Sequence, residues 1–493
     1  MASPRFLLLL VCVFASPAAA QDPSTEGRWV AVVRPGLEDA LAPLIAHRRT
    51  LGHETVVVPN PAQIASKGRP RYVLLVGDVA TTDENPPWAL PSVERALYRW
   101  RNVQPKTFPS DAAYGDLDGD GVPEVPVGRI PARTPGEVER VVAKILAFER
   151  RPVRLSDLRL VAWGGAPGYG GAIDRSATKL FADTIRKSAP PWADLWMISA
   201  AIDQPLCGWP ADQPRLFNES LRRGGLLSAI CAHAGPRHVF SMKHEGQRIT
   251  YGARHVLALS GKEPLAPLVL LACDAGRFHE ERACLAEMLL TLPGGPVSTI
   301  AATTESHPLT NYYTGRCLLR ALSGESVGCI GDAFLSAQRA ALTDRNLLIE
   351  FALKDAEGKL EAHIDVTKLR RDQALMYALL GDPATRLKLP RPLEISTQTQ
   401  DGEWSWSATV PKGTRAIHVG FRPRPQPRQK RGPPANAVAA QIRFDAANTA
   451  LAHSEQPFKR TEDRIHGTVG ERGHLRVVVE TKDALHVGFR VLK

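Results

Sequence analysis

The chain has 493 residues, of which 44% are hydrophobic and 23% are charged, with a formal net charge of +11. This composition is that of a globular protein, and the length allows two or three domains with a sizeable core. An intrinsically disordered chain is excluded, although 40 prolines and 39 glycines indicate many loops.

Residues 1–20, MASPRFLLLLVCVFASPAAA, have the pattern of a secretory signal peptide. Arg5 supplies the positive charge, residues 6–15 the apolar stretch, and Ala18–Ala20 the small residues before a cleavage site. This apolar stretch is too short to span a bilayer. We therefore expect a secreted or periplasmic protein that begins at Gln21 and has no transmembrane segment.

An N-terminal α/β subdomain is expected over residues 21–155. Apolar runs of strand length alternate with helical periodicity, and one of the two predicted helices begins with a proline. The expected strands are 28–33, 54–59 and 70–78, and the expected helices are 37–52 and 135–150.

A second α/β series is expected over residues 156–390. Its apolar strands again alternate with helices, which is typical of a parallel sheet covered on both faces. The expected strands lie in 158–165, 224–235, 267–276 and 295–304, and the expected helices lie in 174–188 and 283–292.

Residues 391–493 change in character and predict a β-sandwich of immunoglobulin-like type. Short alternating segments are expected as strands at 404–410, 416–423, 437–445, 474–482 and 485–492. This region holds 17 Lys and Arg against 10 Asp and Glu. Since no aromatic residues are interleaved with the basic ones, we interpret the excess as a solvated basic surface and expect no nucleic-acid partner.

Two residues with nucleophilic and basic side chains end two of the predicted strands, Cys273 in PLVLLACDAG and His233 in GLLSAICAHAG. In open α/β sheets, reactive groups gather at the carboxyl ends of the strands. If the two strands are neighbours, a thiol and an imidazole share one crevice, which suffices for nucleophilic acyl transfer. Taken singly, either residue could instead be an ordinary core residue.

Four segments together carry a resemblance to a known family: LLVGD at 74–78, the Asp-rich stretch and helix at 110–150, LLACDAGRFHEERACLAEMLL at 270–290, and GDPATRLKLP at 381–390. On these segments, residues 28–389 resemble the gingipain family of cysteine peptidases. The resemblance implies a caspase-like catalytic unit in two subdomains that acts on protein or peptide substrates and needs no cofactor for its chemistry.

The same resemblance implies roles for single residues. Cys273 would be the nucleophile and His233 the general acid and base, with Gly235 and Gly276 allowing close approach of the substrate. The family's His-Gly is replaced here by His233-Ala234-Gly235, and Trp163 stands where the family has an acidic residue that orients the histidine.

When the family's segment is aligned without gaps on LVAWGGAPGYGGAID, Trp163 takes the position of that acidic residue, and we expect it to contact substrate. The same alignment places Asp174 at the floor of the specificity pocket. A carboxylate there would pair with a substrate Arg or Lys. The alternative is that Asp174 caps the helix that follows it.

An acidic loop, DLDGDGVPE, has the Asp spacing and glycine of a calcium-binding loop. We expect either a structural Ca²⁺ held by Asp116, Asp118, Asp120 and Glu124, or a solvated acidic turn. The glycine-rich stretch at 163–171 lacks the spacing of a dinucleotide-binding loop, and we expect it to line the substrate crevice.

The function expected from these residues is that of an exported cysteine endopeptidase that cuts after Arg or Lys. An alternative of another class is a catalytically inactive gingipain-like protein that acts in surface adhesion or binding. The disulfide pattern and the oligomeric state do not follow from the sequence.

Overall fold

The computed structural model describes residues 27–66, 68–82, 84–98, 106–167, 171–324, 326–347, 350, 365–400, 402–424 and 432–493, without the side chains of residues 171–176. The predicted signal peptide therefore lies outside the described residues. Within those ranges, no helix is both long enough and apolar enough to cross a membrane.

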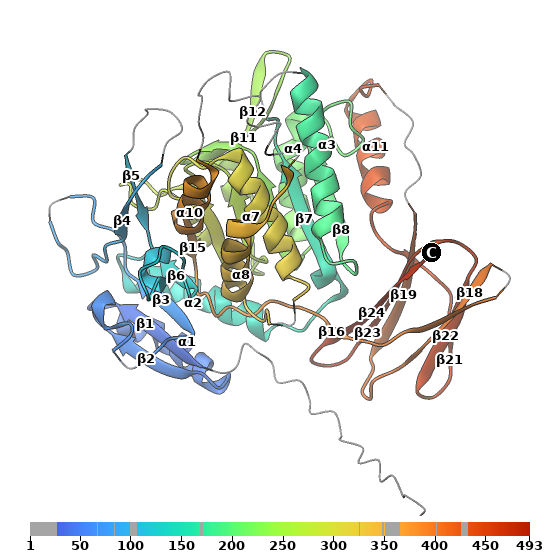
Figure 1. The fold of residues 1–493 in the computed structure, drawn as a ribbon, viewed down its shortest axis with the longest axis horizontal. Coiled ribbons are helices and arrows are strands. Elements are labelled where there is room, and N and C mark those ends of the chain that lie inside the picture. The colour runs from blue at the N-terminus through green and yellow to red at the C-terminus, as the bar shows by residue number, and fades with distance from the viewer. Residues whose placement is uncertain are drawn as a thin grey trace, which may run out of the picture.

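Ten strands of the described chain form one continuous sheet (Figure 1). Their order is β2 (Glu54–Val58), β1 (Arg28–Val33), β3 (Tyr72–Val76), β6 (Val127–Ile130), β15 (Tyr377–Leu380), β14 (Thr299–Ala302), β13 (Leu268–Leu271), β9 (Leu227–Cys231), β7 (Arg159–Gly164) and β8 (Asp194–Ser199). Neighbouring strands run parallel except β14 and β15. β15 thus joins the strands of both predicted subdomains into one sheet.

Helices cover both faces of this sheet, so its inner strands β13 and β14 are buried throughout. In β13, Leu268 and Leu270 pack in one core and Val269 and Leu271 in the other, as alternate strand residues do. The first core includes residues of α1 (Glu38–Thr50), α2 (Pro135–Arg150), α4 (Gln213–Arg222), α5 (Ala253–Ala258) and α6 (Leu285–Thr291). The second includes residues of α3 (Gly171–Ser188), α7 (Pro308–Ala321), α8 (Ile330–Thr343) and α10 (Val366–Met376).

Two smaller sheets extend from the main one. A hairpin is formed by β4 (Val93–Ala96) and β5 (Thr107–Ser110), and a three-stranded sheet by β10 (His233–Gly235), β11 (His238–His244) and β12 (Gln247–Gly252).

The Gly-Arg and Gly-Asp segments that carry the family resemblance hold the sheet together. The buried guanidinium of Arg129 donates to the Asp111 carboxylate at 2.6 and 2.8 Å and to the Gly77 carbonyl at 2.9 Å. The buried Asp382 carboxylate accepts a hydrogen bond from Arg48 Nε at 2.7 Å. These residues lie in the interior and support the fold, not the chemistry.

The last hundred residues form two sheets that share one core. One contains β16 (Arg391–Pro392), β24 (Leu485–Leu492), β23 (Gly473–Glu480), β19 (Ala416–Pro423) and β20 (Ser454–Glu455). The other contains β17 (Ser396–Gln400), β18 (Glu403–Thr409), β22 (Arg464–Val469) and β21 (Lys459–Arg460). The strand predicted at 437–445 is wrong, because α11 (Ala437–Thr449) occupies it. An immunoglobulin-like topology stays a prediction.

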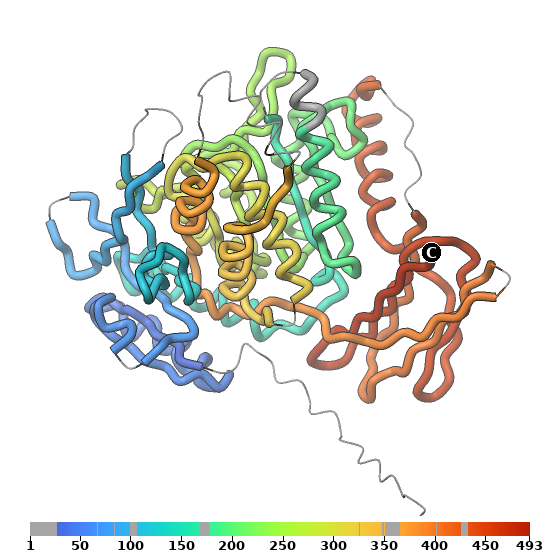
Figure 2. The backbone as a smooth tube through the Cα atoms, viewed as in Figure 1, coloured from blue at the N-terminus to red at the C-terminus, as the bar shows by residue number. Residues whose placement is uncertain are grey.

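This C-terminal region packs against β8, the last strand of the main sheet (Figures 1 and 2). The buried Asn448 amide accepts a hydrogen bond from Met197 N at 2.7 Å and donates to Met197 O at 3.1 Å. Beside it, the Asp194 carboxylate lies 3.0 Å from both His453 Nδ1 and Arg476 Nη2. The side chain of Asn448 therefore pairs with the strand edge as a neighbouring strand would.

Candidate active site

The thiol of Cys273 lies just beyond the carboxyl end of β13. Asp274, directly after it, has a positive φ of 60°, which turns the chain sharply away from the strand. The turned loop is held on β14, since Asp274 N donates to Thr304 O at 3.0 Å and Gly276 N donates to Ala302 O at 2.9 Å. Cys273 is thus fixed at the edge of the sheet, partly buried.

The imidazole of His233 is brought to the same edge by strand register. β9 and β13 are parallel neighbours, with Cys231 paired to Leu271. His233 lies two residues beyond Cys231, as Cys273 lies two residues beyond Leu271. The condition that these two strands are neighbours is met, and both residues follow the ends of adjacent strands.

A backbone carbonyl orients the histidine. His233 Nε2 lies 2.6 Å from Pro167 O, in the segment that follows β7. Because a carbonyl can only accept, Nε2 carries the proton, and Nδ1 is the basic nitrogen. The carbonyl takes the orienting place that a carboxylate would otherwise fill.

The thiol is not ionised by its surroundings alone. Burial raises the pKa of Cys273, hydrogen bonds with Ser306 oppose this, and the carboxylates of Asp274 and Glu305 raise the pKa further. A group that removes the thiol proton during attack is therefore required, and the histidine can supply that base.

The model of peptidase family C25 matches residues 22–388. The chain belongs to peptidase family C25, the gingipain family. Membership in C25 supports a cysteine peptidase function.

Solved structures show that this C25 member has the gingipain fold. It aligns with the Arg-specific cysteine proteinase gingipain R at 13% identity and a TM-score of 0.55, over 96% of this chain and 99% of the other. For the complex of Porphyromonas gingivalis RgpB pro- and mature domains the values are 13% and 0.52, over 95% and 100%. An uncharacterized protein of Archaeoglobus fulgidus is 22% identical over 334 residues, which cover 60% of this chain and 74% of the relative.

The structure does not place all the predicted substrate-binding residues of this C25 chain at the crevice. Trp163 is fully buried, with its ring 4.9 Å from that of Phe217, so its predicted contact with substrate is wrong. Gly276 is buried against β14, where a side chain would meet Ala301 O at 2.7 Å. Its lack of a side chain serves packing of the nucleophile loop, not approach of a substrate.

The other two predicted substrate-binding residues lie at the carboxyl edge of the sheet. Gly235 ends β10 and is partly buried beside the ring of His238. Asp174 is the fourth residue of α3, which begins at Gly171, so it does not cap the helix. Its side chain lies outside the described part, and its role in specificity stays a prediction.

Three of the four predicted calcium ligands lie close together in the acidic loop. Carboxylate oxygens of Asp116, Asp118 and Asp120 lie within 4.8 Å of one another. Asp116 accepts hydrogen bonds from Gly119 N and Gly121 N, which shape the loop. The carboxylate of Glu124 instead contacts Leu117 N and Arg339.

Glu124 stabilises the acidic loop through a hydrogen bond to its backbone. Its carboxylate accepts a hydrogen bond from Leu117 N at 2.8 Å and lies 3.4 Å from Arg339 Nη1. The arrangement therefore offers three carboxylates to a hard cation, with Glu124 as a support of the loop.

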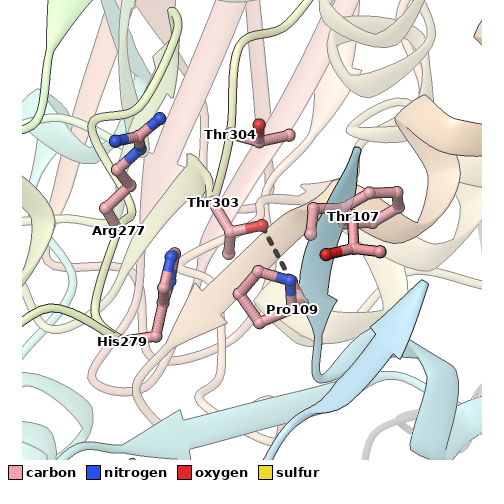
Figure 3. Close-up of a pocket in the computed structure, with 7 residues that line it drawn as sticks. Thr107, Pro109, Arg277, His279, Thr303 and Thr304 are labelled. Carbon is pink, nitrogen blue, oxygen red and sulfur yellow. Dashed lines mark hydrogen bonds between the residues drawn. The ribbon is translucent and has the colours of Figure 1, made fainter. Parts of the chain in front are cut away.

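A cavity of about 450 Å³ adjoins the nucleophile loop on its β14 side (Figure 3). Residues from β5, from the nucleophile loop and from the segment directly after β14 line it: Thr107, Phe108, Pro109, Arg277, His279, Thr303 and Thr304. The charge of Arg277 is balanced by Asp274 at 2.9 Å and Glu280 at 3.1 Å. Burial and the neighbouring Arg277 lower the pKa of His279. The cavity therefore suits an uncharged side chain.

Sequence reasoning missed two residues that contact the candidate pair, Pro167 and Ser306. Ser306 O lies 3.5 Å from Cys273 Sγ, and Pro167 O binds His233. A signal for Ser306 was present, since it follows the buried strand PVSTIAA as Cys273 follows its own. Pro167 contacts His233 through its backbone carbonyl, so the residue type at position 167 could not predict this contact.

Proposed function

We propose that this chain is an exported cysteine endopeptidase, with Cys273 as nucleophile and His233 as general acid and base. The observation that carries the proposal is the register of β9 and β13, which sets both residues two positions beyond paired strand ends. Export is proposed from the signal-peptide pattern of residues 1–20.

The proposed reaction is acyl transfer through a thioester. The thiol proton passes to His233 Nδ1 as the sulfur attacks the peptide carbonyl carbon, and backbone N–H groups stabilise the oxyanion. The C–N bond then breaks, and the imidazolium gives its proton to the leaving amine. Water, deprotonated by His233, hydrolyses the thioester, and the proton returns to sulfur. The Pro167 carbonyl supports the imidazolium through Nε2–H.

Cleavage after Arg or Lys is proposed through Asp174. The residue lies in the first turns of α3, the helix that follows β7, and β7 pairs with β9, the strand that leads to His233. Gingipain R is described as Arg-specific. A carboxylate at this edge of the sheet would pair with the positive charge of the substrate side chain.

Intact-mass labelling tests the proposal. One adduct of a peptidyl-arginyl acyloxymethyl ketone is expected on Cys273, absent from Cys273→Ala and strongly reduced in His233→Ala. Cys317→Ala, which removes a buried thiol on α7, is the matched control and should keep the adduct. If folded protein forms no adduct with either arginyl or neutral probes, the alternative is favoured, namely a catalytically inactive gingipain-like protein that acts in adhesion or binding.

The same labelling separates specificity from chemistry. Asp174→Asn is expected to slow the arginyl probe by more than about tenfold, because the ligand cation loses its charged partner. The rate with a neutral probe should stay unchanged. An equal loss with both probes would contradict a role for Asp174 in specificity.

A structural Ca²⁺ at Asp116, Asp118 and Asp120 is proposed as well. Calcium at millimolar concentration is expected to raise the melting temperature by about one to three degrees over the protein in EGTA. Asp120→Ala should remove the difference, whereas Glu263→Gln, at an exposed acid elsewhere, should retain it. Identical melting with calcium and with EGTA would contradict the site.

A further inference from the structure

We propose that Ser306 and Asn311 form a positioning pair that holds a hydrogen-bond donor against the Cys273 sulfur and favours its thiolate. This inference rests on the proposed function, because it assigns a role in preparing the nucleophile. The pair approaches the sulfur from the β14 side, away from the β9 side that carries His233.

The contact to the sulfur comes from the segment between β14 and α7. Cys273 Sγ lies 3.8 Å from Ser306 Oγ, within the range of sulfur hydrogen bonds, and the neutral thiol donates to Ser306 O at 3.5 Å. Because a carbonyl can only accept, the hydroxyl is the group of Ser306 that can donate to the thiolate. Asn311 Nδ2 lies 2.8 Å from Ser306 Oγ. Ser306 and Asn311 are 7% and 6% exposed, so bulk water does not compete for these contacts.

The amides of Gln373 and Asn311 give the direction of the hydrogen bonds beside the serine. Thr310 Oγ1 lies 2.9 Å from the His307 carbonyl and 2.7 Å from Gln373 Oε1, so its single proton lies between two acceptors. Gln373 Nε2 then donates to Asn311 Oδ1 at 2.9 Å, and the Tyr377 hydroxyl donates to the same oxygen at 2.7 Å. With two donors on Oδ1, Asn311 presents Nδ2 to the serine.

Ser306 Oγ therefore accepts a hydrogen bond and keeps its own proton to donate. Two acceptors lie within reach of that proton, the Tyr377 oxygen and the Cys273 sulfur. Loss of the thiol proton makes the sulfur the stronger acceptor, because hydrogen bonds to charged groups are about twice as strong. The network thus stabilises the thiolate without supplying a charge.

The neighbours of the sulfur show why a donor is useful there. Burial and the carboxylates of Asp274 and Glu305 disfavour the thiolate. In the proposed mechanism, the cation opposite the thiolate is the imidazolium of His233, which forms only during the reaction. The other titratable neighbours, Cys231 and Tyr377, are neutral, since burial raises the pKa of Cys231 to about 11 and that of Tyr377 well above its usual value. Ser306 is the hydrogen-bonding partner that favours the ionised sulfur.

The pH dependence of Cys273 alkylation by iodoacetamide, followed by intact mass, tests the pair without requiring peptidase activity. Ser306→Ala is expected to raise the apparent midpoint by about one pH unit and to slow alkylation about tenfold below it. Ser306→Thr should restore the midpoint, whereas Ser306→Val, of nearly the same shape, should not. Asn311→Asp should also raise it, because the new carboxylate accepts the serine proton.

Ser298→Ala is the matched control, since Ser298 Oγ is buried without a partner in the described part of the chain. An unchanged midpoint in Ser306→Ala and Ser306→Val, or an equal shift in Ser298→Ala, would overturn the proposal. Thermal melting of each variant identifies those that fail to fold. If the midpoints shift as expected but peptidyl probes never react, the proposed function fails while the pair stands.

Discussion

Turnover of a peptide substrate is expected to fall to background in Cys273→Ala and by about 10²- to 10⁴-fold in kcat in His233→Ala. The thiol is required because it forms the thioester, and the imidazole is required because burial raises the pKa of Cys273. The measurement is steady-state kinetics on a fluorogenic peptide between pH 5 and 9.

His244→Ala is the matched control for this experiment. His244 ends β11, and β11 pairs with the strand that carries His233, so the variant tests the small sheet without the proposed base. Its rates should match those of the unmodified chain. Rates in His233→Ala near that level would show that another group removes the thiol proton.

Asp382→Ala is expected to lower the free energy of unfolding by about 2–5 kcal/mol, because buried donors lose their acceptor at about 1–3 kcal/mol each. Arg48 keeps its ion pair with Glu149 at 2.9 Å. The Asp382 carboxylate accepts hydrogen bonds from Arg48 Nε at 2.7 Å, Trp29 Nε1 at 3.1 Å and Ala384 N at 3.0 Å. Arg48 and Asp382 are both fully buried. Urea unfolding monitored by tryptophan fluorescence measures the change.

Glu54→Ala is the surface comparison for Asp382→Ala. Glu54 pairs with Arg28 at 2.9 Å, but its side chain is 62% exposed. Exposed pairs contribute up to about 1 kcal/mol, so the expected loss is small. Equal losses in the two variants would contradict a structural role for the buried network around Asp382.

The sequence predicted the parts of the site that lie on long buried runs. PLVLLA is apolar throughout, and GLLSAI is apolar except for Ser228. Cys273 directly follows the first run, and His233 follows the second after Cys231 and Ala232. In such runs the sequence does not show which face of the sheet a residue occupies, because hydrophobicity does not alternate along a strand that is buried on both faces. The error at Trp163 follows from this, because its strand is apolar on both faces.

Two features of the fold depend on contacts that no local pattern reports. β15 has four residues, and its place between β6 and β14 is set by pairing across the two subdomains. In α11, Val438, Ala440, Ile442 and Phe444 suggest alternation, although Val438 and Ile442 are exposed. The buried residues Ala440, Phe444 and Ala447 follow a helical period, which decides the conformation.

The amide of Asn448 on Met197 bears on how this protein can be divided in evolution or in the laboratory. The sequence predicts a domain boundary after residue 390, yet a chain that stopped there would leave the outer edge of β8 open to pairing with another copy. The C-terminal hundred residues are therefore no exchangeable appendage. Any domain that replaced them would have to supply its own cover for that edge.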